Sequence, residues 1–175
     1  MIGEVFIFGT SHSLQCGKPE GRPGVSRMEA EIRRIIAKFG IRRIAEEMSC
    51  DGLRESGTHE TVCQRLAGED LPVQFVDLDR AERTKLAISD SQIVGFVLGL
   101  LHSGNEGEEA RVREALTDQL CHEVRERVCV ARVLTGYEWP VLYVCGADHA
   151  VPVRRLLAGI GVRARIVHRD FDPDE

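Results

Sequence analysis

Several features that would assign this chain of 175 residues to a specialised class are scarce or absent. Aromatic residues make up 5% of the chain, which argues against a surface that stacks nucleic-acid bases. Lysine and arginine are scattered and the formal net charge is -5, so the concentrated basic face of a nucleic-acid-binding protein is not expected. No apolar run approaches the roughly 18 residues of a transmembrane helix. We therefore expect neither nucleic acid nor a membrane as a partner.

The chain also lacks the signals of export and of structural zinc binding. Its N-terminus has neither the basic region nor the small-residue cleavage site of a signal peptide, which favours a cytoplasmic protein. The six cysteines form no C-x-x-C pair, so we expect them to be reduced and not to hold structural zinc. A hydrophobic content of 43% is typical of one globular domain, and we expect a single domain over residues 1–175.

Apolar runs with the length of strands alternate with helical patterns along the chain. This alternation predicts an α/β fold: one three-layer domain with a mainly parallel sheet of four or five strands and helices on both faces. The expected strands are 4–8, 41–45, 73–76, 141–145 and 162–167, and the expected helices are 26–39, 59–67, 93–101, 106–135 and 151–158. The final residues, 169–175, form an acidic tail.

Two further segments have more than one interpretation. Residues 13–25 are rich in glycine and proline, and a loop of that length is either a functional lid over a crevice or a surface excursion. The apolar run 93–101 follows a capping-box pattern that begins at Ser89, and it is either an internal helix or the face of a homodimer.

A G-x-x-H pattern occurs twice, each time directly after an apolar run. The first copy is Gly9-Thr10-Ser11-His12 and the second is Gly146-Ala147-Asp148-His149. In a parallel sheet both histidines would lie at the carboxyl ends of strands, where open α/β folds place their ligand crevice. The sequence therefore predicts that His12 and His149 face a common site.

Acidic residues follow two other expected strands. Glu46 and Glu47 end the second strand, and because successive side chains of a strand point in opposite directions, one of the two is expected at the site, with a slight preference for Glu46. Asp77 follows the third strand and either joins the site or caps the next segment. His168 could join the cluster, whereas His59, His102 and His122 fall on helices or helix starts and are expected at surface or packing positions.

Histidine and carboxylate together support two related chemistries. They can bind a divalent metal such as Mn, Co or Zn, which lowers the pKa of its bound water to about 7 in favourable cases. Alternatively, a histidine held by a carboxylate can activate water as a general base, an effect of about 10² to 10⁴ in rate. Both routes indicate hydrolysis.

Four segments, in order, resemble the TraB/Tiki and erythromycin-esterase/ChaN-like superfamily. They are Phe8-Gly9-Thr10-Ser11-His12, Ile44-Ala45-Glu46-Glu47-Met48, Val124-Arg125-Glu126 and Val144-Cys145-Gly146-Ala147-Asp148-His149. The superfamily includes metal-dependent proteases, esterases that open macrolide rings and a haem-binding protein. The chain is small for this group.

The resemblance implies a hydrolase of ester or amide bonds that acts on a small-molecule or peptide substrate. In that interpretation His12 and Glu46, or Glu47 in its place, bind metal or activate water, and His149 is a second ligand or an acid. Arg125 would stabilise the developing oxyanion, or else lie on a solvated helix face. The alternative is a module that binds a nucleotide or haem in the same crevice without chemistry. A Rossmann-type nucleotide site is disfavoured, because Gly9 is the single glycine of the G-x-G-x-x-G fingerprint in that turn.

Overall fold

A computed structural model of the chain describes residues 3–17, 23–68, 70–86, 88 and 107–172. The expected helix 93–101, its Ser89 capping box and His102 lie outside these residues, as do the middle of the 13–25 segment and the last three residues of the acidic tail. No helix in the described part of the chain is long and apolar enough to cross a membrane.

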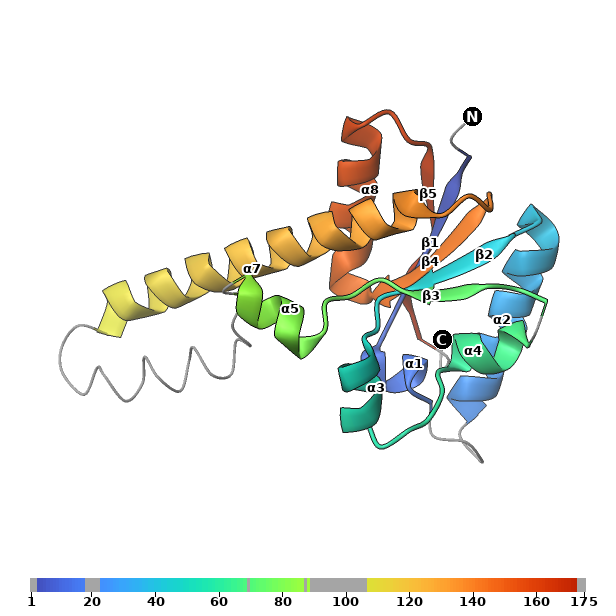
Figure 1. Ribbon diagram of the computed structural model, residues 1–175, viewed down its shortest axis with the longest axis horizontal. Helices are drawn as coiled ribbons and strands as arrows, with labels where there is room; N and C mark the ends of the chain where they lie inside the picture. The colour runs from blue at the N-terminus through green and yellow to red at the C-terminus, as the bar shows by residue number, and fades with distance from the viewer. Residues whose placement is uncertain (1–2, 18–22, 69, 87, 89–106, 173–175) are drawn as a thin grey trace.

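One five-stranded sheet forms the centre of the molecule, in the order β3-β2-β4-β1-β5 (Figure 1). The strands are β1 (Val5–Thr10), β2 (Arg43–Glu46), β3 (Val73–Phe75), β4 (Val141–Gly146) and β5 (Ala164–Phe171). Every neighbouring pair is parallel. The predicted α/β class with a parallel sheet is therefore confirmed, and all carboxyl ends of the strands lie at the same edge.

Helices cover both faces of this sheet (Figure 1). On one side lie α2 (Pro23–Phe39) and α4 (Val62–Ala67), and on the other lie α7 (Gly107–Thr135) and α8 (Ala150–Gly159). Alternate residues of each strand feed two separate cores: Phe6 and Phe8 pack with α2, whereas Val5 and Ile7 pack with α7 and α8. The three-layer arrangement thus follows from strands that are apolar on both faces.

Short helices after the strands were the elements that the sequence patterns did not predict. They are α1 (His12–Gln15), α3 (Cys50–Glu55) and α5 (Arg80–Lys85). Each begins at a capping side chain: Ser11, Ser49 and Asp79 accept hydrogen bonds from backbone N–H groups of the first turn. Helices of four to six residues are too short to show a hydrophobic period, so the caps were their main signal.

Several element boundaries differ from the predicted ones, and three of the differences have a clear physical reason or consequence. Helix α2 begins at Pro23 and not at residue 26, because proline is well suited to the first helical position. Helix α4 begins after Thr61, whose capping box with Gln64 stops the helix from extending back to residue 59. Strand β5 runs to Phe171, so residues 169–171 of the expected acidic tail belong to the sheet.

Candidate functional site

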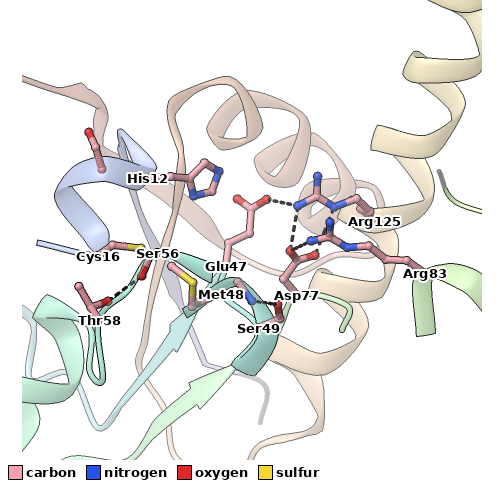
Figure 2. A pocket seen from close by; sticks show the side chains of 12 residues that line it. His12, Cys16, Glu47, Met48, Ser49, Ser56, Thr58, Asp77, Arg83 and Arg125 are labelled. Carbon is pink, nitrogen blue, oxygen red and sulfur yellow. Dashed lines mark hydrogen bonds and ion pairs between the residues drawn. The ribbon is translucent and has the colours of Figure 1, made fainter. Parts of the chain in front are cut away.

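A pocket of about 460 Å³ opens at the carboxyl edge of the sheet (Figure 2). Its walls come from the ends of strands β2 and β3 and from helices α1, α3, α5 and α7. The lining residues are His12, Ser13, Cys16, Glu47, Met48, Ser49, Gly52, Ser56, Thr58, Asp77, Arg83 and Arg125. Most of these side chains are polar or charged, and residues from distant parts of the sequence meet here.

Glu47 is the buried carboxylate of the pocket, with 3% of its surface exposed. Its Oε2 accepts a hydrogen bond of 3.0 Å from the backbone N–H of Gly146. Its Oε1 accepts one of 3.4 Å from Arg125 Nη2 and lies 3.4 Å from His149 Nε2. Burial raises the pKa of Glu47, and the neighbouring His149, His12 and Arg125 oppose that rise. The carboxylate is thus fixed by groups from β4, α7 and the turn before α8.

Asp77 lies near Glu47 and binds two arginines. Arg125 binds it with two nitrogens, Nε to Oδ1 at 3.2 Å and Nη2 to Oδ2 at 2.9 Å. Arg83 Nη2 donates to Oδ2 at 2.8 Å. Burial raises the pKa of Asp77, but Arg125 and Arg83 outweigh burial and hold it below its ordinary value. Asp77 therefore serves as a fixed negative charge that orients Arg125.

His149 lies behind Glu47, in the short 3₁₀ turn Ala147–His149, and 6% of its surface is exposed. Its Nδ1 is 2.9 Å from Oε1 of the buried Glu126 on α7. The ring of His122, one turn earlier on α7, stacks on it with centroids 5.3 Å apart and an angle of 20°. The hydrogen bond with Glu126 raises the pKa of His149.

These contacts form one line in which acidic and basic side chains alternate, which we call the charge chain. In order, its members are Glu126, His149, Glu47, Arg125, Asp77 and Arg83. Helix α7 supplies two members, Arg125 and Glu126, which are consecutive in the sequence. Arg132 of the same helix pairs with Glu82 on α5 and donates to the carbonyl of Asp77 at 2.6 Å. Helix α7 therefore ties the ends of strands β2, β3 and β4 together.

His12 is the exposed histidine of the pocket and the first residue of α1. Figure 2 shows its imidazole pointing toward the carboxylate of Glu47. Gly146 separates the two histidines: a Cβ at this position would lie 3.1 Å from His12 Nε2 and 3.2 Å from His149 Cδ2. The glycine of the second G-x-x-H pattern thus leaves room for both imidazoles.

Glu46 lies away from this group. Because side chains alternate along a strand, it points to the α2 and α4 side of the sheet, where Thr61 Oγ1 donates to its Oε2 at 2.6 Å. Its Oε1 is buried with no hydrogen-bond partner in the structure. Burial raises the pKa of Glu46 to about 7. Of the acidic pair it is therefore Glu47, and not the slightly preferred Glu46, that the structure places with His12, Arg125 and His149.

The remaining candidates divide between the pocket and the surface. Asp77 joins the site and also accepts from the backbone N–H of Leu78. His168 does not join it; its Nε2 lies 2.7 Å from Glu31 Oε1 on α2. Sequence reasoning missed two members of the charge chain. Glu126 directly follows Arg125, which the sequence had indicated. Arg83 lies on α5, and the capping-box pattern Asp79-x-x-Glu82 was a sequence signal for that helix.

The expected metal ligands do not fit a divalent ion. Within the described part of the chain, no three His, Cys, Asp or Glu side chains are arranged to hold one. Glu46 points away from the pocket, and both ring nitrogens of His149 face carboxylates. His12 and Glu47 alone would leave most positions of a Mn, Co or Zn ion without protein ligands.

Fold and site define an α/β protein with a charged pocket at the carboxyl edge of a parallel sheet. No protein-family model and no curated protein matches the sequence. Among solved structures, the chain is similar to ChaN of Campylobacter jejuni, in a structure described as cofacial haem binding. The sequence identity is 13% and the TM-score is 0.49, with 98% of this chain and 84% of that chain covered. Similarity at this level does not establish membership of a family.

Proposed function

We propose that this protein hydrolyses an ester or amide bond of a small-molecule or peptide substrate, with His12 as the general base. The observation that supports this function is the pairing of an exposed imidazole with a buried, firmly held carboxylate. His12 is exposed in the pocket, and Glu47 beside it is held by Gly146, Arg125 and His149. An imidazole that gains a proton next to a carboxylate is stabilised as the cation, which assists proton abstraction from water.

The chemistry follows from this placement. The imidazole of His12 removes a proton from water while the water oxygen forms a bond to the substrate carbonyl carbon. The carbonyl electron pair moves to oxygen and gives a tetrahedral intermediate. As that intermediate collapses, the bond to the leaving oxygen or nitrogen breaks, and the imidazolium of His12 returns the proton to the leaving group. Water is consumed, and an acid and an alcohol or amine are released.

Arg125 is placed to stabilise the oxyanion. Its Nε and Nη2 are engaged by Asp77 and Glu47, and within the described residues its Nη1 makes no hydrogen bond. A guanidinium held by its other two nitrogens loses little freedom when it binds an oxyanion, and its charge persists at every physiological pH. Asp77 therefore contributes by orienting Arg125 before the substrate arrives.

The competing function is binding of a small ligand without chemistry. The observation in its favour is the charge chain itself, because Arg125, Asp77 and Arg83 already neutralise one another and form stable polar walls. If haem were the ligand, His12 would be the residue that holds its iron. Nine of the twelve lining residues are polar or charged, which gives a nucleotide or another small polar molecule hydrogen-bonding partners.

The first prediction separates these two functions. His12→Ala is expected to lower kcat about 10² to 10⁴-fold on whichever ester or peptide the wild type cleaves, because the general base is removed. The melting temperature should stay within the error of the wild type, because the side chain is exposed. The measurement is steady-state turnover on panels of aryl esters, lactones and peptides, paired with thermal melts.

The matched control is His59→Ala, since His59 is also exposed and does not line the pocket. It should retain full turnover. Equal turnover by His12→Ala and wild type would exclude His12 as the base. A wild type without turnover on every panel that is nevertheless stabilised by nucleotides or haem would favour the binding module.

A further inference from the structure

We propose that Glu126 and His149 form a positioning pair that holds Glu47 in its place beside His12 and does not itself contact substrate. The catalytic consequence of this inference rests on the proposed function, whereas the arrangement of the pair can be tested without any substrate. The inference reassigns His149 from a metal ligand or acid to a support for the pocket carboxylate.

The first argument is the order of contacts. The Nδ1 of His149 meets Oε1 of Glu126 at 2.9 Å, and its Nε2 meets Oε1 of Glu47 at 3.4 Å. Both edges of the ring are therefore occupied by carboxylates from different elements, α7 and the end of β2. A ring held at both nitrogens cannot turn without breaking a contact. The ring therefore supports the side chain of Glu47 from the side that faces away from the pocket.

The second argument is where these groups lie relative to solvent. Glu47 and His12 line the pocket, but His149 and Glu126 are not among its lining residues. Glu126 and His122 instead line a groove between α7 and α8. His149 is buried between the two cavities. A substrate in the pocket would thus meet Glu47 and His12, with the pair out of reach behind them.

The third argument is charge balance. The charged or titratable groups that face the ring of His149 are Glu126 and Arg125 from α7, Glu47 from β2, His122 by stacking, and His12 across Gly146. Two carboxylates in direct contact favour the imidazolium, and one guanidinium opposes it. An imidazolium donates from both nitrogens, which matches acceptors on both sides. Loss of Glu126 would leave Nδ1 without its acceptor and release the ring.

The test compares Glu126→Gln, Glu126→Asp and Glu123→Gln in the full chain. The first readout is the ring ¹⁵N spectrum of His149, assigned with His149→Gln. In the wild type the pKa of His149 should lie above that of a free imidazole. In Glu126→Gln the midpoint of the ring titration should fall, and Glu126→Asp should recover part of the fall. Glu123→Gln, a carboxylate of α7 paired with Arg127, should match the wild type.

The second readout is turnover. Loss of a residue that orients a metal ligand typically costs about 10- to 100-fold, and we expect an effect of the same order when Glu126 no longer orients His149. Glu126→Gln should lower kcat by about that factor with KM unchanged and shift the pH profile, and Glu126→Asp should restore part of the loss. A lower kcat with an unshifted profile would contradict the pair.

Failure of the inference and failure of the proposed function are distinguishable. If Glu126→Gln leaves both the His149 spectrum and the pH profile unchanged, the positioning pair is wrong, even if His12→Ala abolishes turnover. If the spectrum changes as expected and no panel substrate is cleaved, the pair stands as a structural unit and the hydrolase function is wrong.

Discussion

Two adjacent carboxylates on the same strand end meet opposite surroundings. Glu46 and Glu47 are both almost fully buried, at 0% and 3% exposure. Glu46 faces the α2 and α4 core, where the hydroxyl of Thr61 is its partner and burial raises its pKa to about 7. Glu47 faces α7, where Arg125 and His149 surround it. Both carboxylates are buried, so burial does not decide which of them belongs to the candidate site. The charged neighbours of Glu47 do.

Helix α7 accounts for the difference between these two sides. The α2 and α4 side is built from apolar side chains, including Met28, Ile32 and Ile35. The α7 side combines an apolar stripe with charged residues at its border, so that Val130 and Val133 pack in the core while Arg125 and Glu126 reach the strand ends. The same helix thus contributes to folding and assembles the candidate site.

The largest expected effect comes from removing the cation that joins Glu47 and Asp77. Arg125→Gln leaves two buried carboxylates without their shared guanidinium, and breaking a buried ion pair in this way typically costs about 3 to 5 kcal/mol. The free energy of unfolding, measured by urea titration at pH 7, should fall by that amount. Hydrolytic turnover should be lost as well.

The control for this change is Arg127→Gln, two residues further along α7. The Arg127 side chain is 69% exposed and its ion pair with Glu123 spans 3.9 Å, so the variant should lose less than about 0.5 kcal/mol. Similar losses in both variants would mean that the charge chain contributes no more to stability than a surface ion pair.

The second effect concerns the pH dependence of stability that Glu46 contributes on the α2 and α4 side of the sheet. Because the pKa of Glu46 rises from 4.5 to about 7 in the folded protein, the fold keeps a proton that the unfolded chain loses between these values. Ionisation of Glu46 therefore costs the wild type about 3 kcal/mol of stability as pH rises through that window, at 1.36 kcal/mol per unit. Glu46→Gln cannot ionise and escapes this cost.

The quantity to measure is the stability of each variant relative to wild type at pH 4 and at pH 8. The stability of Glu46→Gln relative to wild type should be about 3 kcal/mol higher at pH 8 than at pH 4. The pKa of Glu47 is also raised, so the relative stability of Glu47→Gln should change in the same direction between these pH values. A Glu46→Gln variant whose relative stability is the same at both pH values would contradict the description of Glu46 as a carboxyl that the fold keeps protonated.

The sequence predicted the sheet well because its signals were local and strong. Five apolar runs became five parallel strands, and Gly40 ends α2 with a positive φ of 61°, as expected for a helix stop. The two G-x-x-H patterns placed His12 and His149 at strand ends on either side of Gly146. These features depend on neighbouring residues, which a sequence displays directly.

The choice between Glu46 and Glu47 could not be made in the same way. Alternation along a strand shows that two neighbours point apart, but it does not show which face carries the site. That depends on where α7 packs, some 80 residues later in the chain. For the same reason the contact of Glu126 with His149 and that of Arg83 with Asp77 became visible only when α7 and α5 were placed beside the strand ends.

The smallest expected effect concerns the hydroxyl that serves Glu46. Thr61 Oγ1 donates to Glu46 and accepts from the N–H of Gln64 as the cap of α4. Thr61→Val keeps the shape but removes both hydrogen bonds, with an expected loss of about 1 to 2 kcal/mol, whereas Thr61→Ser should lose less than half of that. The loss in Thr61→Val should be larger at pH 8 than at pH 5, because a hydroxyl stabilises an ionised carboxylate more than a neutral one. Chemical denaturation at both pH values measures this. A larger loss in the serine variant than in the valine variant would mean that the methyl packing of Thr61, more than its hydroxyl, supports this side of the sheet.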